Sequence, residues 1–395
     1  MIPVSKAKEL VLEKCVSVGT EIIPLYEAVE RVSVNDLFAP IDTPPFDQSA
    51  MDGYAILYKD LEQFSSFRLL QEIPAGTHLS LQHLPGSTLR IFTGAPVPDG
   101  YDTVVPQENV KQAGRNVVIT NPPLKPGQHV RPRASQSRQG DLALKAGTCL
   151  NPGALAYLAS LGFDRLEVFR LPKISLIMTG NEIQRPGTRL QAGHIYESNS
   201  YGLSAVLKQF GIAPEAIHFV PDIESTIRDA IEKALAQSDV LILSGGVSVG
   251  DYDLVVPALK ASGVKEVFHK VKQKPGKPLF FGTHDKKLVF ALPGNPAAVL
   301  TCYYQYILPA LKKFTGYPEP YQNCMHLPIS SGYAKKPGLT HFLKARAQDH
   351  FVLPLEGQES YLMNTFALAN CLIELEEDCT EVKKGELVKV HFFQA

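Results

Sequence analysis

Residues suited to phosphate chemistry gather between positions 239 and 296 of this 395-residue chain. An apolar run, Val240–Leu243, leads into a glycine-rich turn, Ser244–Gly250, and then into Asp253 and a helix-like segment. A strand that ends in glycines before a helix leaves backbone N–H groups free to bind a phosphate. A second glycine turn, Leu292–Pro296, follows a group of four lysines, Lys270, Lys272, Lys274 and Lys277. Together these groups indicate an anion site with a metal ion or an acid–base group beside it. The plainer alternative is an ordinary α/β domain with glycine turns and solvated lysines.

Two further acids follow predicted strands in the same part of the chain. Glu182 comes after the apolar segment Ile174–Met178, and Asp222 comes after Ile217–Val220. Strands alternate here with helical segments, which predicts a parallel sheet with helices on both faces and ligands beyond the carboxyl ends of its strands. Glu182, Asp222 and Asp253 should therefore lie along one rim, where three carboxylates beside a phosphate cradle favour Mg²⁺. Asp222 could instead simply cap the helix after it.

The N-terminal third contains an ordered loop with two aspartates. Prolines, a glycine and small residues surround Asp47 and Asp52 in the segment 44–55, so both acids should be held firmly, for chemistry or as turn caps. Thr93 ends a predicted strand at a Gly-Ala-Pro turn. The basic segment His129–Arg138 could cover an anion or serve as a surface linker.

Hydrophobic periodicity predicts the elements that position these groups. Helices are expected at 5–16 with Ser5 as its cap, 25–34, 152–161 with Asn151 as its cap, 200–209, 223–236, 254–260 and 296–314. Short β-rich runs predict a small β domain within 67–139, with strands at 88–93 and 116–120. The same pattern after residue 317 predicts a C-terminal β module, with strands at 345–348, 351–354 and 387–393.

Composition limits the partners of the chain. The 39 basic and 40 acidic side chains give a net charge of −1, so no global field is available to hold a nucleic acid. The six cysteines are scattered without C-x-x-C spacing, which is typical of reduced thiols in a cytosolic protein. The N-terminus lacks the apolar core of a signal peptide, and no run approaches the length of a membrane helix. We therefore expect a cytoplasmic protein without a membrane or nucleic-acid partner.

Six motifs together resemble the MoeA/gephyrin E-domain family of molybdopterin molybdenumtransferases. In chain order they are PFDQSAMDGYA (45–55), FTGAPVP (92–98), TGNE (179–182), SGGVSVGDYD (244–253), KPGKP (274–278) and LPGNP (292–296). The resemblance covers nearly the whole chain. It implies a multidomain protein with a central, doubly wound α/β molybdopterin-binding domain (171–316), an inserted β-rich domain (42–140) and a C-terminal β-barrel-like domain (317–395). Residues 1–41 and 141–170 would form a discontinuous helical and linker domain.

The same resemblance implies a reaction and a set of site residues. A homodimer would insert molybdate into adenylylated molybdopterin, release AMP and use Mg²⁺, and a separate adenylyltransferase could dock on it. Catalytic roles would fall to Asp52, Thr93, Glu182, Asp222 and Asp253, of which the last three would hold the metal. Substrate would be bound by Ser244, Gly245, Gly246, Ser248, Gly250, Lys270, Lys274, Lys277, Pro278, Gly294, Asn295, Lys344 and Ser360.

The chain departs from the family pattern at three places. Ala134-Ser135-Gln136 stands where the family usually has Gly-Glu-Asp, Lys344 replaces an arginine after Phe-x, and Glu359 interrupts a Gln-Gly-Ser pattern. These changes bear on molybdate affinity more than on the fold, because a lysine lacks the bidentate fork of an arginine. Two other functions remain open: a CinA-like hydrolase or deamidase of nucleotides, and a non-catalytic, gephyrin-like scaffold.

Overall fold

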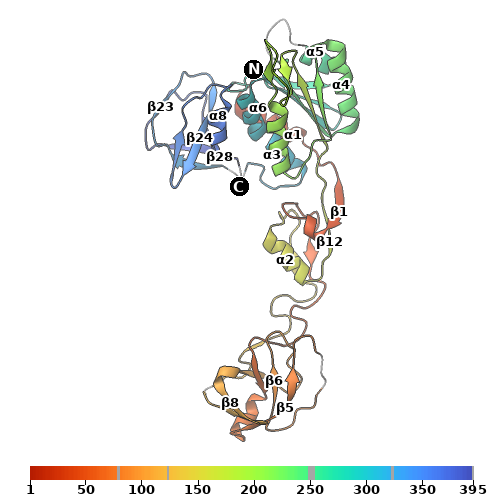
Figure 1. Cartoon of the computed structure of the whole chain (residues 1–395), viewed down its shortest axis with the longest axis vertical. Coiled ribbons are helices and arrows are strands. Elements are labelled where there is room, and N and C mark those ends of the chain that lie inside the picture. Colours follow the sequence, from red (N-terminus) through yellow and green to blue (C-terminus); the bar gives the residue numbers. More distant parts are fainter. Residues whose placement is uncertain (78–80, 122–123, 248–253, 322–323, 394–395) are drawn as a thin grey trace. The chain divides into compact units, whose positions relative to one another are not determined.

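The computed structural model describes residues 1–77, 81–121, 124–247, 254–321 and 324–393 (Figure 1). These residues divide into two compact units: residues 22–168, and residues 1–21 together with 169–395. Each unit is described by itself below. The predicted site residues Ser248, Gly250 and Asp253 lie outside the described residues, as does the whole of the first glycine turn beyond Val247. None of the described helices is both long enough and apolar enough to cross a membrane.

A six-stranded sheet is the centre of the larger unit, with the strand order β16-β13-β17-β21-β20-β18. Its strands are β13 (Ile174–Thr179), β16 (Ala216–Val220), β17 (Val240–Ser244), β18 (Lys265–His269), β20 (Phe280–His284) and β21 (Lys287–Leu292). The first four strands of that order are parallel, as predicted, whereas β20 runs antiparallel to both of its neighbours, β21 and β18. The strands that the sequence predicted, at 174–178, 217–220 and 240–243, are thus parallel as expected, and the reversed strand β20 is one that it did not predict. The physical reason for the reversal is the tight turn between His284 and Lys287, which is too short for the crossover that a parallel pair needs.

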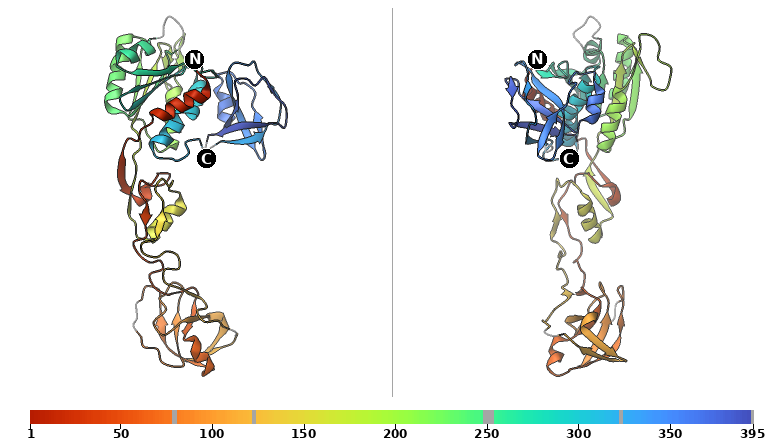
Figure 2. Two further views of the ribbon diagram at one scale, coloured as in Figure 1. Left: turned by 180° about the vertical axis from the view of Figure 1, so that it is seen from behind. Right: turned by 60° about the vertical axis from the view of Figure 1, so that its left-hand side comes forward.

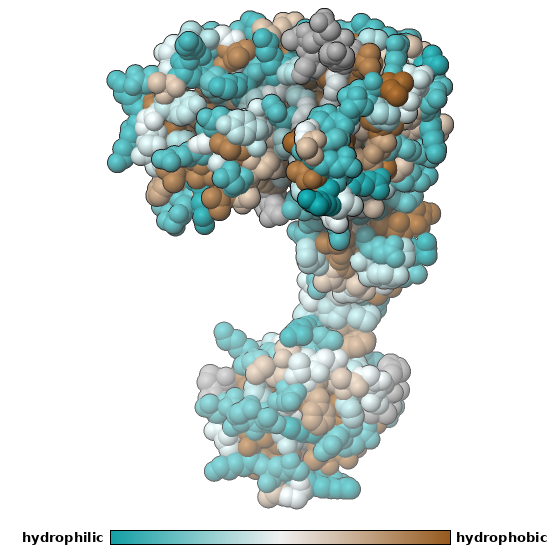
Figure 3. Space-filling view, turned by 45° about the horizontal axis from the view of Figure 1, so that its top comes forward, coloured by the Kyte–Doolittle hydropathy of each residue, from teal (hydrophilic) through white to brown (hydrophobic). Residues whose placement is uncertain are grey.

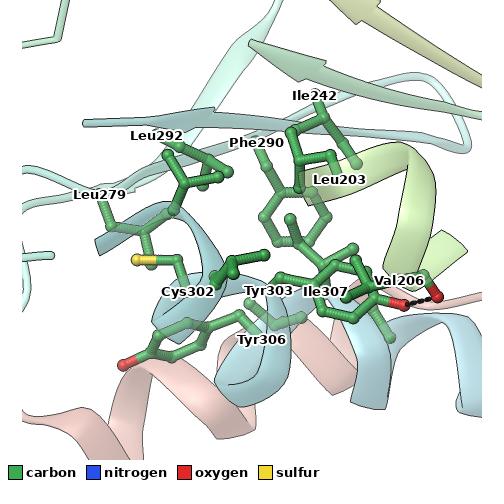
Figure 4. Close-up of a cluster of buried hydrophobic side chains, with 14 of the residues drawn as sticks. Leu203, Val206, Ile242, Leu279, Phe290, Leu292, Cys302, Tyr303, Tyr306 and Ile307 are labelled. Atoms are coloured by element: carbon green, nitrogen blue, oxygen red, sulfur yellow. Dashed lines mark hydrogen bonds between the residues drawn. The ribbon is translucent and has the colours of Figure 1, made fainter. Parts of the chain in front are cut away.

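Helices cover both faces of this sheet, which confirms the doubly wound arrangement (Figure 2). Alternate residues of each strand face opposite layers: Ile242 packs against α3 and α6, whereas Leu241 and Leu243 pack against α4 and α5. The helices are α1 (Val4–Lys14), α3 (Asn199–Gln209), α4 (Glu224–Gln237), α5 (Val255–Ala261), α6 (Pro296–Cys302) and α7 (Leu308–Phe314). Figure 4 shows how side chains of α3 and α6 pack beneath the sheet residues Ile242 and Phe290.

The helix predicted at 296–314 contains a π-helical turn, Tyr303–Ile307, between α6 and α7. Pro309 explains it, because proline has no N–H to donate and its ring would clash with the carbonyl four residues earlier. That carbonyl belongs to Gln305, and the hydroxyl of Tyr321 donates to it instead over 3.2 Å. The wider turn thus keeps the helix continuous and its last carbonyls satisfied.

Helix α1 packs into the same core through Val4, Ala7 and Val11, and it lies alongside α7 (Figure 2). It begins one residue before the predicted cap Ser5, with Pro3 at the N-cap and no side-chain cap bond. The domain boundaries proposed from the sequence remain a prediction.

A second sheet of the larger unit has the order β19-β24-β26-β28-β22, with β25 paired to β24. Its strands are β19 (Gln273–Lys274), β22 (Cys324–Pro328), β24 (Thr340–Gln348), β25 (Phe351–Pro354), β26 (Cys371–Leu375) and β28 (Leu387–Phe392). A short helix, α8 (Met363–Leu368), and the strand pair β23 (Tyr333–Ala334) with β27 (Glu381–Val382) complete this region. Because β19 comes from the α/β part and pairs with β24, the two sheets are joined next to Lys274. On the face shown in Figure 3, hydrophobic residues are scattered among hydrophilic ones.

The smaller unit contains the predicted β domain. Its main sheet has the order β7-β4-β6-β5-β9-β8 and comprises β4 (Gly53–Ile56), β5 (Phe67–Ile73), β6 (Ser87–Ile91), β7 (Thr103–Pro106), β8 (Val110–Ala113) and β9 (Asn116–Ile119). Helix α2 (Pro152–Ser160) is capped by Asn151 as predicted, through a 2.8 Å bond from the Ala154 N–H. The predicted helix at 25–34 is wrong. Only the 3₁₀ turn Leu25–Glu27 forms, because Ser33 makes a β-bridge to Val168 instead of continuing a helix.

Candidate active site

A cavity of about 730 Å³ opens at the carboxyl ends of β13, β16, β17 and β21 in the larger unit. Eleven of the predicted site residues line it: Glu182, Asp222, Ser244, Gly245, Gly246, Lys274, Lys277, Pro278, Gly294, Asn295 and Ser360. They come from five loops and from the segment after β25, far apart in the sequence. The structure thus gathers the predicted glycine turns, two of the lysines and two of the acids at one place.

The two glycine turns meet at the floor of this cavity. Gly245 and Gly246 have φ values of +100° and +61°, which only glycine adopts without strain. A Cβ on Gly245 would clash with the Thr179 carbonyl oxygen, and a Cβ on Gly294 would lie 4.0 Å from the Gly245 Cα. Because no side chain of the described residues separates these glycines, the backbone groups of both turns there are left open to a ligand.

Two buried polar atoms beside the turns have no hydrogen-bond partner among the described residues. They are the hydroxyl of Thr179 and the side-chain carbonyl of Asn199, and both residues line the cavity. The amide of Asn199 donates to Ser244 Oγ (2.9 Å) and to the Gly294 carbonyl (2.8 Å), so it bridges the two turns. Unsatisfied buried groups are rare, and a ligand that hydrogen-bonds there would satisfy them. Sequence reasoning missed both residues, although Asn199 directly precedes a predicted helix.

The two acids occupy neighbouring loops. The Asn181 N–H donates to Asp222 Oδ2 (3.2 Å) and the Asp222 N–H donates to Asn181 Oδ1 (3.1 Å), which ties the loops after β13 and β16 together. Asp222 does not cap α4, because the N-cap is Ile223 and no side chain caps it. The alternative of a simple helix cap is therefore wrong. Glu182 is exposed, and its carboxylate lies next to Gly180, where a Cβ would be 2.7 Å from Glu182 Oε2.

The turn that carries Lys274 and Lys277 is fixed from behind by Gln273, which is fully buried. Gln273 Nε2 donates to the Pro275 carbonyl over 3.1 Å, and its Oε1 accepts a short hydrogen bond from the hydroxyl of Tyr306. The side chains of Lys274 and Lys277 are exposed, and neither forms an ion pair within the described ranges. Two ammonium groups without an ion-pair partner in the described ranges are thus carried by a turn that hydrogen bonds of Gln273 hold in place.

Two predicted lysines do not line the cavity. Lys270 adopts φ +73° and exchanges backbone hydrogen bonds with Leu279 and Ile2. Lys344 is buried, and its ammonium donates to the carbonyls of Glu359 (3.0 Å) and Leu362 (2.9 Å). Burial lowers the pKa of Lys344, and the charge of Glu359 offsets part of that effect. Direct substrate binding by either lysine therefore finds no support in the structure.

Lys344 instead holds the segment that carries Ser360. Ser360 accepts a hydrogen bond from Asn295 Nδ2 over 2.8 Å, and its carbonyl accepts one from the Ala297 N–H over 3.1 Å. The C-terminal segment is thereby attached to the start of α6, at the edge of the cavity. Lys272, which was counted in the lysine group, is paired with Glu377 over 2.5 Å.

Asp52 and Thr93 belong to the smaller unit and are paired with each other. Asp52 Oδ1 accepts 2.7 Å hydrogen bonds from the backbone N–H and from the hydroxyl of Thr93, which lower the pKa of Asp52. Their action on the substrate remains a prediction. Asp47 accepts a hydrogen bond from the Arg133 N–H over 2.7 Å, so its carboxylate holds a distant loop in place instead of capping its own turn. The basic segment around Arg133 is anchored to residues 42–49 through this bond and the β10–β3 pair, Val130–Arg131 with Gln48–Ser49.

Family comparisons agree with this architecture from end to end. Three family models match in order: MoeA N-terminal region (domain I and II) at residues 2–162, a probable molybdopterin binding domain at 175–313, and MoeA C-terminal region (domain IV) at 326–393. The chain belongs to the MoeA family. It is a transferase of molybdenum cofactor biosynthesis, as the resemblance predicted.

Several relatives cover nearly the whole chain. A molybdopterin molybdenumtransferase of Nostoc sp. is 36% identical over 94% of this chain and 83% of its own length. One of Haemophilus influenzae is 32% identical over 100% of this chain and 99% of its own length. The crystal structure of a molybdopterin biosynthesis MoeA protein from Pyrococcus horikoshii matches with a TM-score of 0.83 and 28% identity over 100% of both chains. The predicted family and fold class are confirmed.

Proposed function

We propose that the protein inserts molybdenum from molybdate into adenylylated molybdopterin and releases AMP. The observation that carries this proposal is the convergence of two glycine turns, two unpaired lysines and two carboxylates on one cavity of about 730 Å³. A cavity of this volume takes a ligand of nucleotide size, and its polar groups are few and convergent, as in small-molecule sites generally.

The first task of the site is to hold several anions together. The glycine turns and Ser244 would bind the phosphate of the pterin through backbone and hydroxyl donors. Lys274 and Lys277 would act as point charges that offset the repulsion between the diphosphate and the molybdate dianion. Thr179 and Asn199 have unsatisfied polar atoms that a bound ligand would satisfy.

The reaction then exchanges bonds at phosphorus and at molybdenum. The anhydride bond between the pterin phosphate and AMP breaks, with water or a molybdate oxygen as the nucleophile. The two dithiolene sulfurs bond to molybdenum, and the displaced oxo groups leave as water after taking up protons. The residues of the cavity contribute by positioning the reactants and by stabilising the charge on the departing AMP.

Mg²⁺ fits the acids that the structure describes. The described residues contain no group of three metal-binding His, Cys, Asp or Glu side chains, but Glu182 and Asp222 face the same cavity. Mg²⁺ in phosphate-handling sites commonly takes one or two carboxylates, and its other ligands are water and substrate oxygens. Glu182 and Asp222 would hold the ion, and Asp253 would join them as the sequence predicts. When bound, Mg²⁺ supplies Lewis-acid polarisation of the phosphoanhydride.

We also infer a homodimer in which Asp52 and Thr93 of one subunit serve the cavity of the other. Mixing inactive Asp52→Ala and Lys274→Ala subunits tests this arrangement. Random exchange would give half heterodimers, each with one intact site, and thus about a quarter of the wild-type activity. No recovery of activity after verified subunit exchange would contradict the arrangement.

A molybdopterin adenylyltransferase is a further proposed partner, because the substrate must be adenylylated before it reaches this site.

AMP release by the purified protein tests the function itself. We expect molybdate-dependent conversion of adenylylated molybdopterin to AMP and active cofactor, and little turnover by Lys274→Ala. Lys286→Ala is a matched control, since Lys286 is equally exposed but lies in the turn before β21, at the opposite end of that strand. Release of AMP from ADP-ribose without pterin would favour a nucleotide hydrolase instead. Pterin binding without turnover would favour a scaffold.

A further inference from the structure

A cysteine, a histidine and a glutamate from three neighbouring strands form a hydrogen-bonded chain in the C-terminal sheet. Cys324 of β22 lies directly opposite His391 of β28, and its Sγ is 2.9 Å from His391 Nδ1. The other ring nitrogen, Nε2, is 2.5 Å from Oε2 of Glu374 on the adjacent strand β26. Nucleophile, base and orienting carboxylate are thus in the order that activates a thiol.

The carboxylate fixes the tautomer of the histidine. Burial raises the pKa of Glu374, but the hydrogen bond from His391 and the charges of Lys8 and Lys389 outweigh burial and hold it well below its usual range. Glu374 is therefore ionised and accepts a hydrogen bond from His391 Nε2. The burial of His391 lowers its pKa, so the ring is neutral and Nδ1 carries a lone pair that faces the thiol.

The surroundings of the thiol are positively charged. Lys8 and Lys389 lie 3.1 and 3.2 Å from the Glu374 carboxylate. Burial raises the pKa of the Cys324 thiol, and the charges of Lys389, Lys8 and Lys312 act in the opposite direction. The thiol is consequently protonated at rest and needs a base when it reacts. His391 is that base, and Glu374 stabilises the imidazolium that forms.

Access to the pair is narrow. Cys324 and His391 line a cavity of about 20 Å³ together with Tyr304, Lys312 and Tyr321. A cavity of this size holds a molecule about as large as one water. A peptide, a sugar or a nucleotide therefore cannot reach the sulfur, whereas a small neutral oxidant can.

We propose that Cys324 is a reactive site for hydrogen peroxide, with His391 as its base and Glu374 as the residue that positions the base. The sulfur attacks one peroxide oxygen and the O–O bond breaks. The thiol proton passes to His391 Nδ1 and then to the departing oxygen, which leaves as water. Cysteine is oxidised by two electrons to a sulfenic acid while peroxide is reduced, so that atoms and electrons balance.

Other cysteines of the chain provide internal references. Cys379 is half-buried like Cys324, but its sulfur contacts a backbone carbonyl, that of Glu381, at 3.6 Å. Cys15 similarly donates to the Val11 carbonyl, and burial raises its pKa to about 12. A carbonyl cannot accept the thiol proton permanently, so neither contact activates the sulfur.

The test uses the full chain and limiting hydrogen peroxide. After a short peroxide pulse the remaining peroxide is removed, the protein is unfolded in the presence of a dimedone probe that the native cavity would exclude, and the trapped sulfenic acids are located by mass spectrometry. We expect Cys324 to be labelled at least about tenfold faster than Cys379 and His391→Gln to lose at least tenfold in rate, since general-base catalysis contributes this much or more. Glu374→Gln should shift the pH profile of the Cys324 rate, which a merely structural role would leave in place.

Two results would overturn the proposal. One is equal labelling of Cys324 and Cys379 in the wild-type protein, a measurement that does not depend on any variant folding. The other is an unchanged Cys324 rate in a folded His391→Gln protein. Neither readout uses turnover of pterin, so the proposal stands or fails independently of the proposed transferase function.

Discussion

Two regions of the larger unit gather lysines and acids, yet they use them in opposite ways. In the cleft at the sheet edge, Lys274 and Lys277 are exposed and have no ion-pair partner in the described part of the chain. In the cluster around Glu374, Lys8, Lys389 and His391 all lie within 2.5–3.2 Å of one carboxylate oxygen. The side chains of Lys8 and Glu374 there are only 12% and 11% exposed.

The difference follows from desolvation. A buried charge is tolerated only when a partner of opposite sign and good geometry compensates it, so Glu374 compensates the buried ammonium of Lys8 and links α1 to the C-terminal sheet. A charge in water needs no partner and is free to meet a ligand. Unpaired lysines at an open cavity are therefore the better sign of function, and paired ones are the better sign of structure.

The largest expected effect comes from removing the charges of the cleft. In a Lys274→Ala, Lys277→Ala double variant, AMP release should fall by about 10²–10³-fold, the range found when charge-stabilising donors are deleted from active sites. The urea-unfolding free energy should change by less than about 0.5 kcal/mol, as for other exposed positions. Steady-state kinetics and equilibrium unfolding measure the two quantities on one preparation. A large loss of stability with turnover intact would contradict the comparison.

In the cluster around Glu374 we expect the opposite, a large loss of stability with little change in turnover. Lys8→Met keeps the length and apolar stem of the side chain but removes one ammonium from a buried carboxylate. We expect a loss of about 3 kcal/mol in the free energy of unfolding, because the remaining charge is left less compensated. Turnover at temperatures where the protein stays folded should be unchanged.

Lys6→Met is the matched control for Lys8→Met. Lys6 lies on the same helix and also forms an ion pair, with Glu9 at 2.9 Å, but both side chains of this pair are about half exposed. Surface pairs of this kind contribute little. Equal destabilisation by the two variants would show that the helix, rather than the buried cluster, determines the effect.

Acid should weaken the cluster of charges around Glu374. The folded-state pKa of Glu374 is depressed below its unfolded value, so its contribution is fully present above that unfolded value, about 4.3, and is lost as pH falls through the range below it. The stability difference between wild type and Glu374→Gln should therefore shrink by about 2 kcal/mol between pH 6 and pH 3. Urea unfolding across this range measures it. A constant difference would mean that the pKa of Glu374 is the same in the folded and unfolded states.

Much of this arrangement could be predicted from local patterns. The runs at β13 and β17, the helical spacing of α3 and α4 and the two glycine turns place the cleft correctly, because each depends on neighbours in sequence. The roles of Lys270 and Lys344 could not be predicted. No pattern of neighbouring residues shows that the Lys344 ammonium donates to two backbone carbonyls. Nor does one show that Lys270 adopts a positive φ and accepts a backbone hydrogen bond from Ile2.

The residues that hold the lysine turn from behind could not be predicted from local patterns either. Gln273 and Tyr306 are 33 positions apart, and they meet because Pro309 forces a π turn that changes where the tyrosine lies on its helix. No periodicity calculated for a regular helix would place that hydroxyl next to the lysine turn. Buried hydrogen bonds that hold an active-site turn in place join residues that are far apart in the sequence. Patterns within one sequence do not reveal such contacts.

The smallest effect tests that support. Tyr306→Phe removes the hydroxyl that donates to Gln273 and leaves a buried amide oxygen unsatisfied. The turn that carries Lys274 and Lys277 should loosen, and the KM for molybdate should rise about fivefold, which corresponds to about 1 kcal/mol, with kcat nearly unchanged.

Tyr303→Phe separates this role from general softening of the core. Tyr303 is buried in the same π turn, and its hydroxyl donates to the Val206 carbonyl on α3 over 3.1 Å, away from the lysine turn (Figure 4). Both variants delete one buried hydroxyl and should lose similar stability. If the two raise KM equally, packing alone explains the effect. If only Tyr306→Phe raises KM, the buried amide of Gln273 holds the exposed lysines in position. The geometry of the cleft then depends on the core, although its charge does not.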